Sequence, residues 1–281
     1  MDISKLFDVK GKIVLITGGS RGIGEMIATG FVSNGAKVYI SSRSADVCGQ
    51  VAARLNKQGP GQCISIPTDL QNPESLKHLA EELRKREDRF DVLVNNAGVY
   101  NQQDFDTYTE DKWDEIIDIN LKAPYFLTKY LIPLLTSKST QQDPSRVIMI
   151  GSVASKLNSA IPTYFYCISK AGLQRMSEAL APLLSQRHIT VNTIEPGLFR
   201  SEMTKDLFTQ FSESVISELM KKRIPSGRAG EPEDIAGTCI YLASRAGAYT
   251  NGATIRVDGS LLYSARDIKI LYVTAGLLKN L

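Results

Sequence analysis

The sequence has few side chains that could hold a metal ion or form disulfides. Its 281 residues include two histidines and four cysteines. Cys48, Cys63, Cys167 and Cys239 do not pair at the spacing of metal ligands. We therefore expect no metal site. Such sparse cysteine is typical of a chain that folds without disulfides in a reducing compartment, so a cytoplasmic location is expected.

Long apolar runs are also missing. No stretch approaches the roughly 20 apolar residues that a membrane-spanning helix needs, and residues 1–10 lack the apolar run of a signal peptide. The net charge of +3 is too small to indicate a nucleic-acid partner. The expected partner is therefore a small molecule rather than a membrane or a nucleic acid.

Short apolar runs alternate with helical patterns along the chain. Runs rich in β-branched residues predict buried strands, here at residues 13–16, 37–41, 62–66, 92–94, 146–150, 188–193 and 254–257. Amphipathic patterns predict helices at 23–33, 45–57, 73–86, 110–135, 163–185 and 232–244, with a helical insertion at 199–223. The alternation predicts one α/β domain: a doubly wound parallel sheet (Rossmann fold) of about seven strands with helices on both faces.

A glycine-rich turn joins the first predicted strand to the first predicted helix. Its residues are Thr17, Gly18, Gly19, Ser20, Arg21, Gly22, Ile23 and Gly24. Free N–H groups and the helix dipole at such a helix start attract a phosphate, and glycines let the backbone approach a pyrophosphate. The spacing G-x-x-x-G-x-G differs from the commoner G-x-G-x-x-G, and an ordinary glycine-rich loop is the alternative. The position between a strand and a helix favours a dinucleotide site.

The residues after the second predicted strand indicate which dinucleotide binds. An acidic residue there would bind the ribose hydroxyls of NAD, but the chain has Ser42 and Arg43. Arg43 and Arg21 could bind a 2′-phosphate through charge-assisted hydrogen bonds, each worth roughly 1.5–3 kcal/mol. We therefore expect NADP(H) as the cofactor. The alternative is that both arginines are solvated surface charges.

Tyr166 and Lys170 are four residues apart in a predicted helix, a spacing that places both on one face. A free tyrosine has a pKa of about 10. A nearby ammonium favours the phenolate and lowers that pKa toward the range of efficient proton transfer. The pair predicts a proton donor or acceptor, and a solvated pair on a helix surface is the alternative. Tyr164 lies off the required face, so packing is its expected role.

Ser152 follows the predicted strand at 146–150 through Gly151. Ligands bind at the carboxyl ends of parallel strands, where its hydroxyl could donate to a carbonyl oxygen as negative charge develops. Ser155 is a competing candidate, and capping of the loop is the alternative role for Ser152. Asn120 falls inside the predicted helix at 110–135, where an asparagine competes with backbone bonding and can hold a kink or a water molecule.

In this order and spacing the residues resemble the short-chain dehydrogenase/reductase family over residues 7–260. The matching pieces are residues 17–24, Asp69, the segment Asn95-Asn96-Ala97-Gly98, Asn120, Ser152, Tyr166 with Lys170, and Pro196-Gly197. Within the family the chain is most similar to the 3-oxoacyl reductases, especially the branch associated with rhamnolipid synthesis, through residues 17–24 and 150–154.

The resemblance implies an NADPH-dependent oxidoreductase that reduces a ketone, with 3-oxoacyl thioesters as candidate substrates. It assigns catalytic roles to Asn120, Ser152, Tyr166 and Lys170, with Lys170 also holding the nicotinamide ribose and Asn120 in a water-mediated proton relay. It implies further cofactor contacts from Asp69, Leu70, Asn96, Ala97, Gly98, Pro196, Gly197 and Ser201. For Asp69, a place in the N-cap region of the helix that begins near Pro73 is a second possible role.

The sequence leaves the substrate open. A sugar, a steroid or a polyketide-type secondary alcohol is an alternative to the thioester, and a non-catalytic NADPH-binding sensor is a third hypothesis. An apolar face in 199–223 suits an acyl chain or packing on the core: Phe199, Met203, Leu207, Phe208 and Phe211. The resemblance also implies a homodimer or homotetramer. Because relatives usually end near residue 260, residues 261–281 are expected to be an atypical C-terminal extension of a domain at 1–260.

Overall fold

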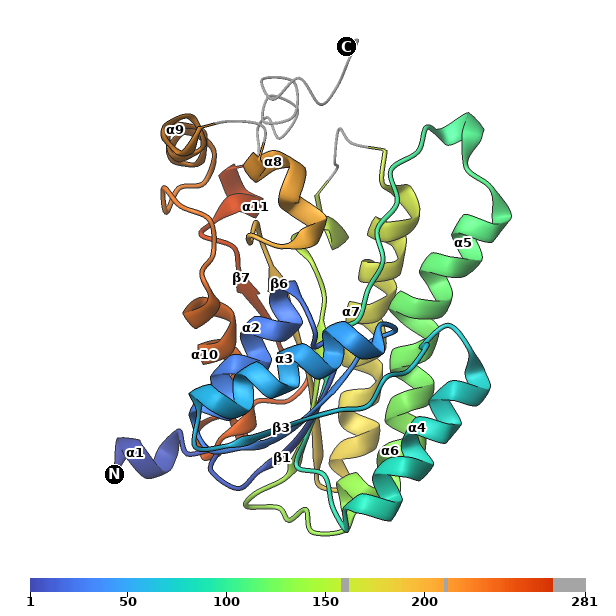
Figure 1. Cartoon of the computed structure of the whole chain (residues 1–281), viewed down its shortest axis with the longest axis vertical. Coiled ribbons are helices and arrows are strands. Elements are labelled where there is room, and N and C mark those ends of the chain that lie inside the picture. The colour runs from blue at the N-terminus through green and yellow to red at the C-terminus, as the bar shows by residue number, and fades with distance from the viewer. Residues whose placement is uncertain (158–161, 210–211, 265–281) are drawn as a thin grey trace.

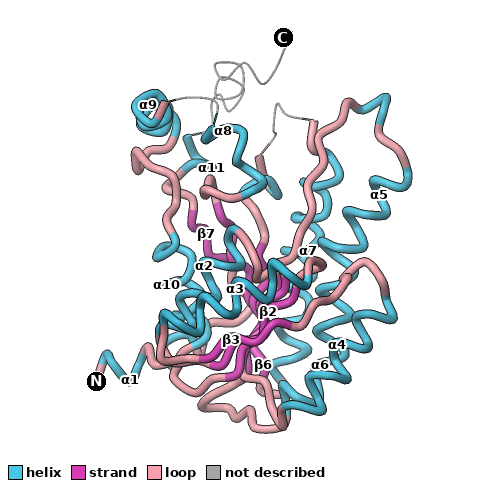
Figure 2. Tube along the Cα trace, viewed as in Figure 1, coloured by secondary structure: helices cyan, strands magenta, loops and turns pink. Residues whose placement is uncertain are grey.

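The structure, a computed structural model, describes residues 1–157, 162–209 and 212–264. Seven strands form one sheet in the order β3-β2-β1-β4-β5-β6-β7. Figure 2 draws the strands in magenta at the centre of the molecule. They are β1 (Ile13–Thr17), β2 (Lys37–Ser41), β3 (Gln62–Ser65), β4 (Val92–Asn95), β5 (Ser145–Ile150), β6 (Ile189–Pro196) and β7 (Thr254–Val257). Every neighbouring pair is parallel. The predicted doubly wound sheet is confirmed.

Helices cover both faces of this sheet (Figure 1). One face carries α2 (Gly22–Ser33), α3 (Ala45–Gln58) and α10 (Pro232–Ala243). The other carries α4 (Pro73–Arg86), α6 (Ala123–Thr136) and α7 (Tyr164–Ser185). Phe31 and Leu55 belong to the core on the first face, and Leu79 and Leu131 to the core on the second. Burying each such side chain contributes roughly 1.5–3 kcal/mol, so two packed layers fix the position of the strand ends.

A third group of helices lies over the carboxyl ends of the strands, at the top of Figure 1. It comprises η4 (Glu202–Thr204), α8 (Lys205–Thr209), α9 (Glu213–Arg223) and α11 (Leu261–Ser264). Leu207, Met220 and Leu261 share a small apolar cluster with Val153, the first residue of η3 (Val153–Ser155) after β5. The segment predicted as a helical insertion therefore packs over the strand ends. Residues 210–211, and with them Phe211, lie outside the described residues.

The single helix predicted at 110–135 is interrupted. α5 (Glu110–Ile117) continues through a π-helical turn, η2 (Asp118–Lys122), into α6. Pro124 has no N–H, so it cannot donate to the carbonyl of Asn120, its partner in a regular α-helix. The Ala123 N–H bonds the Asp118 carbonyl, five residues earlier, and closes the wider turn. Turns of this kind are frequent at functional sites, and this one contains Asn120.

The remaining short elements are α1 (Ile3–Leu6), η1 (Phe105–Thr107) and η5 (Arg245–Gly247). Leu261 of α11 is buried, so α11 packs on the domain. Residues 265–281 of the predicted extension lie outside the described residues, and its assignment stays a prediction. In the described ranges no helix has the length and apolar character to cross a membrane, and no group of three or more metal-binding side chains occurs.

Candidate active site

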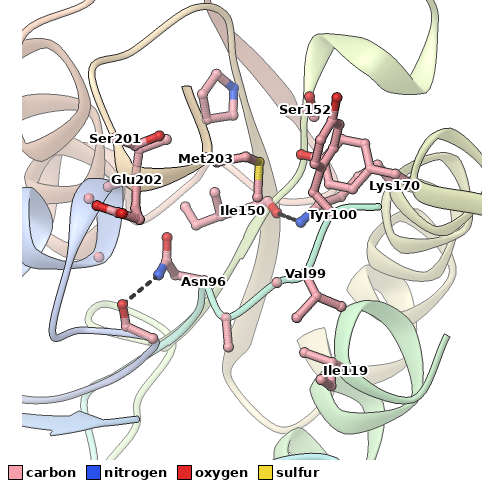
Figure 3. A pocket seen from close by; sticks show the side chains of 18 of the residues that line it. Asn96, Val99, Tyr100, Ile119, Ile150, Ser152, Lys170, Ser201, Glu202 and Met203 are labelled. Carbon is pink, nitrogen blue, oxygen red and sulfur yellow. Dashed lines mark hydrogen bonds between the residues drawn. The ribbon is translucent and has the colours of Figure 1, made fainter. Parts of the chain in front are cut away.

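One large cavity, of about 680 Å³, opens at the carboxyl ends of β1, β4, β5 and β6. Figure 3 shows Tyr100, Ser152 and Lys170 gathered on one side of it, and Ser201 and Glu202 on the other. Apart from Asn120, every residue predicted to contact the cofactor or the reacting groups lines this cavity. Strand ends in a doubly wound sheet meet at such a crevice, so the structure brings together residues that are far apart in the sequence.

The glycine turn folds tightly between β1 and α2. Gly18 and Gly22 have φ angles of 65° and 54°, which glycine adopts at little cost. A Cβ on Gly24 would lie 2.2 Å from the Gly18 carbonyl oxygen and 2.4 Å from Nδ2 of Asn96. That Asn96 amide donates to the carbonyl of Thr17 at 2.9 Å. The turn thus leaves the start of α2, where no side chain caps the free N–H groups, open to an anion.

Two arginines stand at the outer end of the cavity. Arg21 and Arg43 both line it and are exposed, and neither makes a side-chain hydrogen bond or ion pair with any described residue. Ser42 and Leu70 line the same end. Asp69 accepts a hydrogen bond from the Gln71 N–H at 3.1 Å.

Asn72, not Asp69, caps α4: its side chain accepts from the Glu74 N–H at 2.9 Å. Asp69 lies just before this cap and bonds the chain that leads into it, so its place in the N-cap region is compatible with the structure although the cap itself is Asn72. The Asp69 carboxylate remains in the wall of the cavity.

Ser152, Tyr166 and Lys170 converge from β5 and α7. Lys170 Nζ donates to the carbonyl of Ile150 at 2.8 Å, which fixes the ammonium at the end of β5 (Figure 3). It lies 5.7 Å from the centre of the Tyr166 ring. The Ser152 side chain acts to lower the pKa of Tyr166. Tyr166 thus stands between a serine hydroxyl and an ammonium.

Burial governs the protonation of both groups on α7. It raises the pKa of Tyr166, and the nearby Ser152 side chain only partly opposes that rise. Burial also lowers the pKa of Lys170 to about 8. The expected lowering of the Tyr166 pKa by Lys170 was wrong for this structure, because removing the phenol from water disfavours the phenolate more than its neighbours favour it.

The two competing residues have other partners. Ser155 donates to the Glu195 carboxylate at 2.9 Å. Tyr164 is 44% exposed and packs edge-on against Phe105 and Tyr108. Neither lines the cavity, so the geometry favours Ser152 and Tyr166 over these neighbours.

Asn120 is fully buried in the π-helical turn. Its Oδ1 accepts from the Val99 N–H at 2.8 Å, and its Nδ2 donates to the Val99 carbonyl at 2.9 Å. Nδ2 also donates to Ser169 at 3.0 Å. A Cβ on Gly98 would lie 3.4 Å from both Asn120 Oδ1 and Lys170 Nζ. The amide therefore holds the loop after β4 next to the ammonium.

The opposite wall begins where β6 ends. Pro196 and Gly197 line the cavity, and a Cβ on Gly197 would lie 2.7 Å from Asp258 Cα. Ser201 bonds Thr204 through its backbone N–H at 3.0 Å. A Cβ on Gly22 would lie 3.1 Å from Ser201 Cβ, so this wall reaches the glycine turn.

Known proteins share both the sequence and the fold. The model of a family described as enoyl-(acyl carrier protein) reductase matches residues 18–261. A rhamnolipids biosynthesis 3-oxoacyl-[acyl-carrier-protein] reductase of Pseudomonas aeruginosa is 40% identical over 253 residues, covering 90% of this chain and 97% of that protein. A 5-keto-D-gluconate 5-reductase of Escherichia coli is 30% identical, covering 92% and 99%. A solved complex of Pseudomonas aeruginosa RhlG with NADP has a TM-score of 0.86 at 39% identity, covering 92% and 99%.

This chain belongs to the short-chain dehydrogenase/reductase family. The resemblance predicted from the motifs is confirmed, and so is the likeness to 3-oxoacyl reductases. As a member of this family, the protein is an oxidoreductase.

Sequence reasoning did not single out three residues of this short-chain dehydrogenase/reductase, although Tyr100 and Glu202 lie in ranges, 99–107 and 199–223, that it assigned to substrate selectivity. Tyr100 stands edge-on to Tyr166, with ring centres 5.6 Å apart, and Glu202 lines the opposite wall. Glu195 is buried beneath the turn that carries Ser152. Tyr100 follows the end of a predicted strand closely, and this position alone could have indicated that it lies near the ligand site. Glu195 is a carboxylate in an otherwise uncharged buried strand, and such residues are rare unless paired.

Proposed function

We propose that this enzyme uses NADPH to reduce the ketone of a 3-oxoacyl thioester, with Tyr166 as the proton donor. The observation that carries the proposal is the convergence of Ser152, Tyr166 and Lys170 at one end of a cavity whose other end is the glycine turn. A dinucleotide spans such a crevice in doubly wound sheets.

The residues present fit NADPH. The glycine turn packs so closely that a Cβ at Gly24 would meet the Gly18 carbonyl. The start of α2, with its free N–H groups, therefore borders the cavity without a covering side chain. Arg21 and Arg43 would hold the 2′-phosphate, and the serine at position 42 offers no competing carboxylate. The NADP named in the RhlG complex supports this choice. When bound, the nicotinamide supplies hydride to the carbonyl carbon.

The side chains around Tyr166 carry out the proton chemistry. Because its pKa is raised, Tyr166 keeps its proton at neutral pH and can donate it to the carbonyl oxygen. The Ser152 hydroxyl holds that oxygen and favours the phenolate that forms. Lys170, mostly charged below its pKa of about 8, stabilises the same negative charge. Asn120 keeps the loop after β4 in place beside Lys170.

The wall facing Tyr166 suits an acyl chain. Its apolar residues are Val153, Leu157, Leu198, Phe199, Met203, Leu207 and Leu261. Charged side chains of this region are paired with one another: Glu202 lies 3.4 Å from Lys205, and Lys112 lies 2.9 Å from Glu115, so neither lysine is set aside for a sugar acid. The likeness to a 3-oxoacyl reductase therefore guides the substrate choice better than the likeness to a keto-gluconate reductase.

Comparison of substrates tests the proposal. NADPH oxidation is followed with a 3-oxoacyl thioester, with 5-keto-D-gluconate and with a steroid ketone. We expect kcat/KM for the thioester to exceed the others by at least about a hundredfold, since several buried methylenes each contribute roughly 0.8 kcal/mol. A preference for the sugar acid contradicts the substrate choice. NADPH binding without turnover of any ketone contradicts the proposed catalytic function and favours a non-catalytic NADPH-binding sensor.

We also propose a homodimer or homotetramer in the cytoplasm. Exposed apolar side chains on the outer surface of α6 and α7 support association: Tyr125, Ile168 and Leu183 are 42%, 49% and 57% exposed. Light scattering on the purified protein measures the mass, and a monomer at micromolar concentration contradicts this assignment.

A further inference from the structure

Glu195 in β6 is a carboxylate with no exposed surface. Three groups surround it. Ser155 donates to Oε1 at 2.9 Å, Lys156 Nζ lies 3.1 Å from Oε1, and Arg256 Nε lies 3.4 Å from Oε2. A buried charge needs such partners to offset the loss of water. Two of the three come from one short stretch of chain, Ser155 and Lys156, directly after the Ser152 turn.

The same short stretch determines where Ser152 points. Ser152 is the N-cap of η3, and its Oγ accepts from the Ala154 N–H at 3.1 Å. The Ser155 N–H in turn donates to the Ser152 carbonyl at 3.0 Å. Any shift of Ser155 is therefore passed to Ser152 through a single tight turn.

The stem of Glu195 also lies beside the start of this turn. A Cβ on Gly151 would lie 3.5 Å from Glu195 Cγ, and the Gly151 N–H donates to the carbonyl of Ile194 at 2.8 Å. Glu195 thus contacts the chain on both sides of Ser152. On the other side of Glu195, the guanidinium of Arg256 in β7 lies 5.0 Å from the centre of the Tyr263 ring in α11. This contact joins the group around Glu195 to α11.

We propose that Glu195 is a positioning residue that holds η3 so that the Ser152 hydroxyl points at Tyr166 and the substrate carbonyl. The inference rests on the proposed function of Ser152 and Tyr166. Glu195 does not line the cavity and acts only through Ser155 and Lys156. A displacement of about 1 Å at a reacting group can lower a rate by up to a hundredfold, so a firmly held turn matters for turnover.

Paired substitutions distinguish positioning from simple stabilisation. Glu195→Gln keeps the size of the side chain and removes its charge, which weakens the hydrogen bond from Ser155 and the ion pairs with Lys156 and Arg256. Ser155→Ala removes the Ser155 hydrogen bond from the turn. The matched control is Glu87→Gln, a carboxylate whose side chain is 8% exposed and pairs with Lys37 and Tyr39. Lys37 begins β2, so this control lies at the amino ends of the strands, opposite the cavity.

We expect Glu195→Gln and Ser155→Ala to lower kcat by about tenfold to a hundredfold, with the Kd for NADPH changed less than about twofold. The double variant should be no slower than the slower single variant, because both substitutions act on the hold of Glu195 on one turn. Glu87→Gln should keep the wild-type kcat. Wild-type kcat in Glu195→Gln, or a loss no larger than that of the control, overturns the inference.

Hydrogen exchange provides a readout that does not depend on turnover. The amide N–H groups of Ala154, Ser155 and Lys156 are bonded within η3, and they should exchange faster in Glu195→Gln than in Glu87→Gln. Equal exchange in the two variants overturns the inference, whether or not the wild type reduces a ketone. A wild type that reduces no ketone contradicts only the proposed function. If Glu195→Gln does not fold, the same measurements on Ser155→Ala decide.

Discussion

Tyr166 and Lys170 lie one helical turn apart on α7, and burial acts on both. The tyrosine retains its proton and the lysine holds its charge less tightly than in water. Lys170 has one hydrogen bond in the described chain, to the Ile150 carbonyl. A charge buried in this way lowers the stability of the fold, but it also prepares the site for an anion. A substitution of Lys170 should therefore abolish turnover without a matching loss of stability.

Lys170→Met tests that expectation. The pKa of Lys170 is lowered to about 8 in the folded chain, against about 10.4 when unfolded, so between these values the unfolded chain binds more protons. Wild-type stability should therefore rise with pH relative to the variant. We expect a relative gain of about 2 kcal/mol between about pH 7 and about pH 9.5, measured by urea unfolding, and almost no turnover in the variant. Parallel stability curves contradict the buried charge.

Arg43 should determine the choice of dinucleotide. It lines the cavity and has no partner among the described residues, so its charge is available to a 2′-phosphate. Arg43→Ala should weaken NADPH binding by about tenfold, the loss of one charge-assisted bond, and leave NADH binding within about twofold. Fluorescence titration with both dinucleotides measures this. Arg84→Ala, on α4 at a distance from the cavity, is the control, and equal losses in both variants contradict the assignment.

Among the elements, the connection from β1 to α2 is tightly constrained. Gly24, in the first turn of α2, packs against the Gly18 carbonyl and the Asn96 amide. Gly49, in α3, has nothing within 4 Å of its Cβ position. The two glycines therefore differ in the space around them: an added Cβ would clash with the turn at Gly24 and would meet nothing at Gly49.

Gly24→Ala should disturb the turn. Overpacking of this kind costs about 1–3 kcal/mol, and a distorted turn should weaken NADPH binding by about tenfold or more. Gly49→Ala should instead raise stability by about 0.5–1 kcal/mol with unchanged binding. Isothermal titration and thermal unfolding of both variants check the pair. Normal NADPH binding by Gly24→Ala means that the turn does not hold the dinucleotide.

The helix from Glu110 to Thr136 shows the limit of pattern reading within one element. Its apolar spacing predicted one helix in which Asn120 could hold a kink, but the π-helical turn itself was not predicted. Pro124 carried the signal, because a proline four residues after Asn120 removes that residue's helical partner. The apolar periodicity of a long segment does not reveal a single residue that interrupts the helix.

At the scale of the whole molecule, the topology gathers the site. The strand order turns from descending to ascending between β1 and β4, and the chain segments after β1, β4, β5 and β6 all reach the cavity. The apolar runs of the strands made this arrangement predictable, because buried parallel strands leave a clear pattern. The placement of Gly18, Ser152 and Tyr166 around one cavity followed from the strand ends and from the family resemblance.

Properties that depend on distant partners could not be predicted in this way. The pKa of Tyr166 depends on how much chain covers it, and spacing to Lys170 alone indicated the wrong direction. The role of Glu195 depends on Ser155 and Arg256, which are 40 and 61 residues away in sequence. Such contacts exist only once the sheet and the turn are assembled.

The central claim is that the molecule binds NADPH at the glycine turn and transfers a proton from Tyr166. Steady-state turnover and NADPH binding of Tyr166→Phe, beside Tyr164→Phe as the control from the same helix, test it most directly. We predict that Tyr166→Phe lowers kcat by at least about a hundredfold while the Kd for NADPH stays within about twofold, and that Tyr164→Phe resembles the wild type. Near-normal turnover in Tyr166→Phe would contradict the account.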